Sequence, residues 1–237
     1  MTLRRLAPLC AALVAVAYGL VFFYAPDDAD QGVLQKIFYL HVPLAIVALC
    51  GFVAGGLLAG MYLRTGDRRW DLRSYVAIHV ALILAAGTLV TGSIWARAAW
   101  GHWWVWDEPM LVSFLVIFLL YACYQPLRFA VGEPERQARV AAVFAVMAAG
   151  FVPVNFIAVR SAQAFTHPRV LSATGGNMPG SMRLTFVVCL VAMATLYVTL
   201  CRLELAAKRV RIAHARLVRR EREAEDARPL VPLGAAR

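Results

Sequence analysis

Six long apolar stretches, separated by short polar ones, dominate this chain of 237 residues. Each stretch is close to the length that a helix needs to cross the ~30 Å hydrocarbon core of a bilayer. None of them alternates between polar and apolar positions, as the strands of a membrane barrel do. The pattern predicts an all-α polytopic membrane protein, a bundle of six transmembrane helices. The predicted spans are residues 6–24, 40–63, 75–95, 110–127, 140–159 and 184–201.

Composition leaves little sequence for a soluble domain, because 61% of the residues are hydrophobic. We expect residues 1–203 to form one six-span domain and residues 204–237 to form a basic cytoplasmic tail. The first span follows Arg4 and Arg5, as the apolar part of a secretory signal would. It is long for a signal peptide, and residues 24–27 make a poor cleavage site. We therefore interpret it as a retained helix.

The net charge of +10 is concentrated in particular segments. A basic patch such as the one in the tail can bind nucleic acid. Next to six spans it indicates contact with anionic lipid at the bilayer surface instead. The basic residues of the tail are Lys208, Arg209, Arg211, Arg216, Arg219, Arg220, Arg222 and Arg228.

Basic residues also predict the orientation of the chain, since lysine and arginine favour cytoplasmic loops. The N-terminus, the loops at residues 64–73 and 128–139 and the tail are rich in arginine, and six spans place all four on one side. We expect a multi-pass membrane protein with both termini cytoplasmic and the tryptophan-rich loop on the outer side. The last outer loop is an exception, which the binding of an anionic ligand would explain. Its basic residues are Arg160, Arg169 and Arg183.

Small residues predict packing inside the bundle. The second span contains Gly51-x-x-x-Gly55 and Gly56-x-x-x-Gly60, a spacing that lets membrane helices approach closely. The cysteines have no C-x-x-C spacing, so we interpret them as small buried hydrophobes, not as disulfide partners or metal ligands. They are Cys10, Cys50, Cys123, Cys189 and Cys201.

The segment WGHWWVWD, residues 100–107, contains four tryptophans and ends on Asp107. Tryptophan gathers at membrane interfaces as an anchor, and that interpretation stays open. Four in one loop exceed what anchoring needs, and they suggest a docking shelf for a flat apolar ligand. We expect Asp107 either to accept a hydrogen bond from an indole or to cap the next helix. The four tryptophans are Trp100, Trp103, Trp104 and Trp106.

Two histidines, His41 and His167, lie on the same predicted side as the tryptophans. Two neutral imidazoles can take both axial positions of a haem iron, so we predict them as its metal ligands. His102 is the rival for the second position. Arg97 is a candidate for pairing with a haem propionate. We expect His79, inside the third span, to be a hydrogen-bonded structural residue.

The tryptophan motif resembles the "WWD" signature of haem-handling proteins in cytochrome c biogenesis. With six spans and a short chain, the sequence is similar to the CcmC family, the haem exporter proteins C. Segments 35–43, around His41, and 91–97, before the motif, are similar to that family as well, and His167 falls where its second histidine is expected. One departure is that Asp107 is followed by Glu108 and Pro109, where the family usually has a small residue and Arg-Leu-Thr.

The resemblance implies a multi-pass protein of the bacterial inner membrane that binds haem b at the periplasmic face and presents it to the haem chaperone CcmE. It also implies CcmD and the ABC-type pair CcmA and CcmB as partners, and haem transfer rather than an enzymatic activity. A secondary transporter or a structural membrane subunit, with the tryptophan loop as an anchor only, is the alternative. An intramembrane enzyme is least favoured, since no nucleophile–base pair or H-E-x-x-H motif is present.

Overall fold

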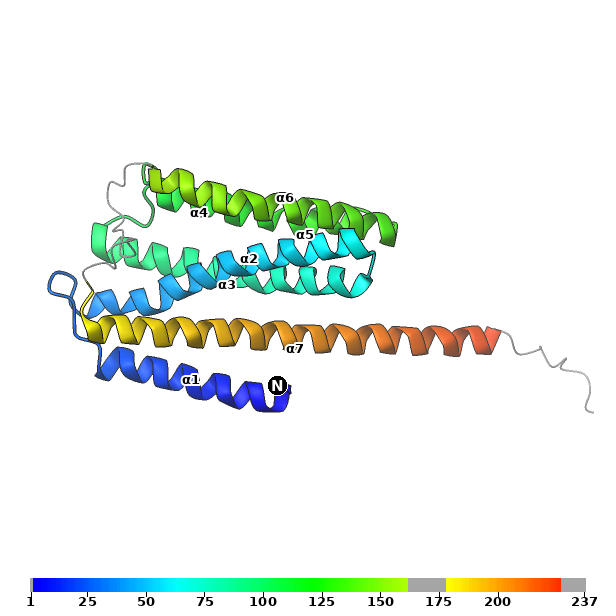
Figure 1. Cartoon of the computed structure of the whole chain (residues 1–237), viewed down its shortest axis with the longest axis horizontal. Coiled ribbons are helices and arrows are strands. Elements are labelled where there is room, and N and C mark those ends of the chain that lie inside the picture. Colours follow the sequence, from blue (N-terminus) through cyan, green and yellow to red (C-terminus); the bar gives the residue numbers. More distant parts are fainter. Residues whose placement is uncertain (1, 162–177, 227–237) are drawn as a thin grey trace, which may run out of the picture.

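The computed structural model describes residues 2–161 and 178–226, and the regular elements of this part are all helices (Figure 1). Within these two ranges, six helical segments are long and apolar enough to cross a membrane, so the predicted six-span bundle is confirmed. The helices are α1 (Leu3–Phe23), η1 (Val33–Ile37), α2 (Phe38–Thr65), α3 (Arg68–Trp100), α4 (Pro109–Ala122), α5 (Tyr124–Phe129), α6 (Pro134–Ser161) and α7 (Gly180–Asp226).

The fourth span is interrupted, which the hydrophobic pattern did not predict. Helix α4 ends at Ala122, and the short helix α5 follows after Cys123. Pro126 explains the break, because proline has no N–H for the helix and its ring clashes with the carbonyl of residue 122. The span as a whole still reaches from Pro109 to Ala130.

Helix α2 is the centre of the bundle and packs against α3, α6 and α7. Its glycines make these contacts close: a Cβ atom at Gly55 would lie 2.5 Å from Ile78 Cγ1 on α3. A Cβ atom at Gly56 would lie 2.1 Å from Ala149 Cβ on α6. The prediction that this helix packs against protein through its glycines is confirmed.

Helix α1 packs on α7 through a small apolar cluster that contains Ala17, Val21 and Cys189. All five cysteines are free thiols, and Cys10 and Cys189 are buried as predicted for small apolar side chains. The prediction of burial is wrong for Cys50 and Cys123, which are exposed on the surface of the bundle. In a bilayer that surface faces acyl chains, which accept a small apolar side chain as readily as a protein core does.

A tight turn joins α2 to α3. Gly66 ends α2 in the left-handed conformation, with φ of 70°. Asp67 then caps α3, and its side chain accepts a hydrogen bond from the backbone N–H of Arg69 at 2.9 Å. A hydrogen bond from the Arg69 side chain lowers the pKa of Asp67. Left-handed glycine followed by an acidic N-cap is a favourable sequence for such a turn.

A buried ion pair joins α3 to α5 at the same end of the bundle. The Arg128 guanidinium donates two hydrogen bonds of 2.7 Å to the Asp71 carboxylate, one to each oxygen. It also lies 3.3 Å from the Tyr124 hydroxyl and 5.1 Å from the ring centre of Tyr75. Both charged residues are buried. The two parallel hydrogen bonds between guanidinium and carboxylate compensate for the hydration that each group loses.

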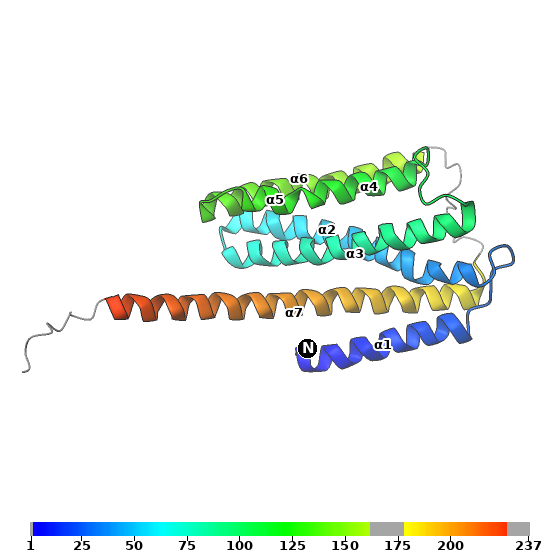
Figure 2. The same ribbon diagram turned by 180° about the vertical axis from the view of Figure 1, so that it is seen from behind.

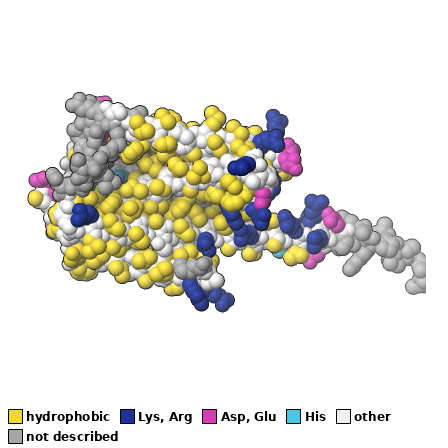
Figure 3. Space-filling view, in the orientation of Figure 1, with side chains coloured by type: hydrophobic (Ala, Val, Ile, Leu, Met, Phe, Trp, Pro, Cys, Tyr) yellow, Lys and Arg dark blue, Asp and Glu magenta, His cyan; other side chains and the backbone are white. Residues whose placement is uncertain are grey.

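The helix ends fall into two groups. The α2–α3 turn and the start of α6 lie at the end from which α7 extends past the other helices (Figures 1 and 2). Lysine and arginine side chains gather at this end, whereas apolar side chains cover the middle of the bundle (Figure 3). The tryptophan loop and the start of α2 lie at the opposite end (Figure 1). Helix α7 continues without a break across residues 203 and 204, the predicted boundary of the tail.

Candidate functional site

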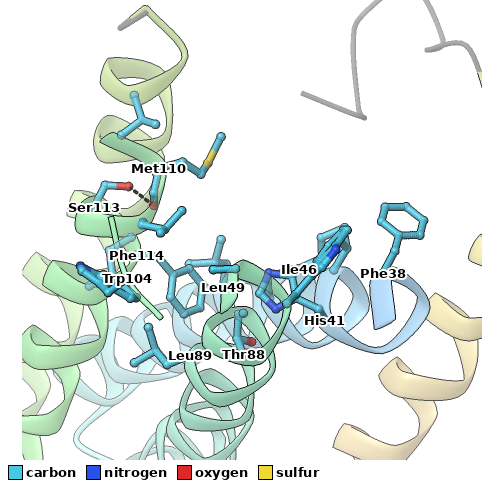
Figure 4. A pocket seen from close by; sticks show the side chains of 18 of the residues that line it. Phe38, His41, Ile46, Leu49, Thr88, Leu89, Trp104, Met110, Ser113 and Phe114 are labelled. Carbon is cyan, nitrogen blue, oxygen red and sulfur yellow. Dashed lines mark hydrogen bonds between the residues drawn. The ribbon is translucent and has the colours of Figure 1, made fainter. Parts of the chain in front are cut away.

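A cavity of about 240 Å³ lies at the end of the bundle that carries the tryptophan loop. Its walls come from the first half of α2, the last half of α3, the first half of α4 and the last half of α6. Figure 4 shows His41 and Trp104 on opposite sides, with Leu49, Leu89 and Phe114 between them. The lining is almost entirely apolar and rich in aromatic rings, which is typical of a site for a flat apolar ligand.

His41 lies in the first turn of α2, and α3 fixes its imidazole. Its Nδ1 is 3.1 Å from the Thr91 hydroxyl oxygen. The edge of the ring meets Trp95, with 5.8 Å between ring centres and 78° between planes. Trp95 donates a hydrogen bond of 2.8 Å from its indole to the Gln31 side chain. His41 is therefore held in one orientation on the cavity wall.

The four tryptophans of the motif divide into two pairs. Trp100 and Trp104 line the cavity. Trp103 and Trp106 do not line it and are exposed, by 61% and 71% respectively. Trp104 and Trp106 meet edge to face with 5.9 Å between ring centres, so the loop carries one ring inward and the next outward. The predicted shelf is thus two surfaces, one inside the cavity and one outside it.

Trp104 has an unusual polar group for an apolar wall. Its indole nitrogen is buried and has no hydrogen-bond partner among the described residues. Leaving such a donor unpaired costs about 1–3 kcal/mol. A ligand with an acceptor atom at this wall would remove that cost.

Arg97 precedes the motif, Asp107 is its last residue, and both side chains are exposed. Arg97 donates a hydrogen bond to the carbonyl of Gly101. Gly101 ends α3 with φ of 80°. The expectation that Asp107 caps the next helix is wrong: the N-cap of α4 is Glu108, and Pro109 is its first residue. Proline suits that position because the first turn of a helix does not use its N–H.

The other histidines separate into different environments. His167 lies outside the described residues, so its place as the second axial ligand stays a prediction. His102, its rival, is exposed in the tryptophan loop. His79 lies toward the opposite end of the bundle, where its Nδ1 is 3.1 Å from the Gln125 amide nitrogen and its ring stacks on Tyr75. The hydrogen bond predicted for His79 is present, and its structural role stays a prediction.

Sequence reasoning related segment 91–97 to the CcmC family, but it assigned no residue of α3 before Arg97 to the site. Thr88, Gly92, Trp95 and Ala99 line the cavity, and Thr91 contacts His41. Their spacing of three or four residues places them on one face of the helix. That periodicity, measured backward from Trp100, was the signal that could have identified them.

The chemistry available at this site is that of one imidazole on an apolar, aromatic wall. The described residues contain no cluster of three histidine, cysteine, aspartate or glutamate side chains that could hold a bare metal ion. Haem carries its iron in a tetrapyrrole, so it needs only axial protein ligands and flat apolar contacts. The side chains of the cavity provide both kinds of contact, and they fit haem better than a free ion.

Comparison with known proteins agrees with the resemblance drawn from the motif. The sequence profile of the CcmC family, described as Heme exporter protein C, matches residues 1–224. Heme exporter protein C of Bradyrhizobium diazoefficiens is 36% identical over 223 residues, which cover 92% of this chain and 82% of that protein. The protein of the same name in Paracoccus denitrificans is 34% identical over 149 residues, 62% of this chain and 61% of that protein. A ccmC-like mitochondrial protein of cytochrome c biosynthesis in Marchantia polymorpha is 32% identical over 173 residues, 73% of each chain. The chain therefore belongs to the CcmC family, Heme exporter protein C.

Proposed function

We propose that this protein binds haem b in the cavity at the periplasmic face of a bacterial inner membrane and delivers it to the chaperone CcmE during cytochrome c maturation. The observation that carries the proposal is the position of His41 and Trp104 on facing walls of one apolar cavity (Figure 4). His41 is an iron ligand in this proposal, and His167 is the second. The aromatic walls hold the faces of the porphyrin.

The size of the cavity supports a transfer role. Sites that bury a drug-sized ligand have volumes of roughly 300–1,000 Å³, and this cavity has about 240 Å³. A tetrapyrrole would enter only in part, and one edge would stay outside. An exposed edge is what a protein needs if it hands its ligand to another protein.

The outward-facing groups of the tryptophan loop are the proposed contact surface for the chaperone. Trp103 and Trp106 are exposed on the same loop that brings Trp104 into the cavity. Exposed aromatic rings are enriched in protein interfaces. Arg97 and Asp107 are exposed as well: Arg97 can pair with a haem propionate, and Asp107 can pair with a positive charge on a partner. Membership of the CcmC family supports CcmD, CcmA and CcmB as further partners.

Two matched double variants test haem binding and haem transfer separately. Trp100→Ala with Trp104→Ala removes two cavity walls, and we expect haem occupancy of the purified protein to fall roughly tenfold or more. Each lost aromatic contact contributes about 0.5–1.5 kcal/mol beyond its buried area. Trp103→Ala with Trp106→Ala should retain the haem absorption spectrum and reduce the covalent haem found on CcmE.

The wild-type protein, purified in detergent, provides the reference spectrum and the reference yield of haem on the chaperone. Protein level in the membrane must be measured for each variant. If both double variants lose protein from the membrane while the remaining protein binds haem normally, the tryptophans are anchors and the proposed site is wrong.

The proposed orientation places both termini in the cytoplasm and the tryptophan loop in the periplasm. In a variant without native cysteines, a cysteine at His102 should react with an impermeant thiol reagent in intact cells. A cysteine at Arg68, in the first turn of α3, should react only after lysis. This follows from the arginine-rich ends gathered on one side (Figure 3). The reverse labelling pattern would overturn both the orientation and the periplasmic site.

A further inference from the structure

The hydrogen bonds of Thr91 bear on which nitrogen of His41 carries a proton. The Thr91 hydroxyl oxygen is 2.8 Å from the Gly87 carbonyl oxygen and 3.2 Å from the Thr88 carbonyl oxygen. Carbonyl oxygens only accept, so the single hydroxyl proton of Thr91 is donated within its own helix. The hydroxyl oxygen is then an acceptor for His41 Nδ1, 3.1 Å away. This bond forms only if Nδ1 carries a hydrogen.

We propose that Thr91 is a positioning residue that holds His41 in the tautomer protonated on Nδ1. In that tautomer the lone pair lies on Nε2, which becomes the nitrogen that binds the haem iron. The proposal rests on the proposed function, in which His41 is an axial ligand. A neutral imidazole has two tautomers, and the hydrogen bond made by one nitrogen selects the state of the other.

Gly92 and Trp95 also contact the His41 imidazole and fix its position. A Cβ atom at Gly92 would lie 2.8 Å from His41 Cε1 and 3.4 Å from Nδ1, so the ring rests directly against the backbone of α3. Trp95 meets the ring edge to face at 5.8 Å. These contacts keep the Nδ1 of His41 beside the hydroxyl of Thr91. The hydroxyl therefore acts on a ring whose position is already defined.

A comparison of Thr91→Val with Thr91→Ser tests the proposal. Valine has nearly the shape of threonine and lacks the hydroxyl, whereas serine keeps the hydroxyl and lacks the methyl group. In haem-free protein labelled with ¹⁵N-histidine, the His41 signal is identified by its absence from a His41→Gln variant. Wild-type and Thr91→Ser proteins should show a protonated Nδ1 on His41. Thr91→Val should show a mixture of tautomers or protonation on Nε2.

The haem-bound protein provides a second measurement. Loss of a hydrogen bond to a metal-binding histidine lowers metal affinity by roughly 10–100-fold. We expect haem affinity to fall by that factor in Thr91→Val and to return in Thr91→Ser. Thr199→Val is the control, because Thr199 makes the same kind of bond to a carbonyl within its own helix, 2.7 Å to Thr195, on α7. It should leave the His41 tautomer unchanged.

Two results would overturn the role of Thr91 and leave the haem site in place. One is a Thr91→Val protein that binds haem normally. The other is a Thr91→Val protein that binds haem weakly while His41 Nδ1 stays protonated, since this would indicate packing alone. A wild-type haem spectrum in a His41→Ala variant would instead remove the ligand on which the proposal rests. The His41→Ala spectrum distinguishes that failure from the first two, because it is lost in both of them while His41 remains a ligand.

Discussion

Replacing His41 with alanine is expected to lower haem binding by more than about 100-fold and to abolish the six-coordinate low-spin absorption spectrum. Loss of a residue that merely supports a metal ligand already costs 10–100-fold, so loss of the ligand itself should cost more. The imidazole lies on the wall of the cavity between Thr91 and Trp95, and no second histidine of the described residues lines that cavity. The measurement is the absorption spectrum of the detergent-purified variant.

Added imidazole provides the control for this variant. It should enter the space that the His41 side chain leaves and restore the low-spin spectrum. His79→Ala is a second control, because His79 lies toward the other end of the bundle beside Gln125. An unchanged spectrum in His41→Ala would refute its role as a ligand.

The same absorption spectrum identifies the second axial ligand of the haem iron. We expect His167→Ala to lose the spectrum and His102→Ala to keep it. His102 is exposed in the tryptophan loop and does not line the cavity. A spectrum lost in His102→Ala and kept in His167→Ala would assign the second position to His102.

Replacing Arg128 with methionine is expected to destabilise the fold by about 3–5 kcal/mol, because the Asp71 carboxylate would remain buried without its partner. For a chain of this size that corresponds to a fall in Tm of roughly 10 °C. The two hydrogen bonds of 2.7 Å between the side chains are the interaction that is lost. The measurement is thermal unfolding in detergent, followed by circular dichroism.

The double variant Asp71→Leu with Arg128→Met separates the charge from the packing. It removes both charges and should recover most of the lost stability, since a buried pair can often be replaced by apolar side chains. Arg69→Met is the matched control, because Arg69 pairs with Asp67 on an exposed turn, where water screens the ion pair and its loss should have little effect on stability. A loss below about 1 kcal/mol in Arg128→Met would mean that the pair does not hold α3 to α5.

The spans could be predicted from sequence because continuous hydrophobicity is a local property. Their ends could not, because polar residues continue a helix beyond the apolar part. Helix α3 begins at Arg68, seven residues before its predicted span, and α7 continues to Asp226. In both cases charged side chains extend the helix where the hydrophobic pattern has already ended.

The position of His41 at the tryptophan end of the bundle could also be predicted, from its segment and the alternation of loops. The cavity could not, because it depends on the register between helices. That register is set by close contacts such as Gly55 with Ile78 and Gly56 with Ala149. The partner of His41, Thr91, lies 50 residues away in sequence and becomes its neighbour only through this packing.

The length of α7 has a consequence for the cytoplasmic side of the proposed topology. Its 47 residues form a rod about 70 Å long at 1.5 Å per residue. Crossing the hydrocarbon core uses only about 30 Å of that length. The remaining length of α7 is a helical spacer outside the hydrocarbon core, and the arginines near Glu223 lie at its far end. Removing two turns from residues 204–223 would bring that charge about 11 Å closer to the bilayer without altering the proposed haem site at the other end.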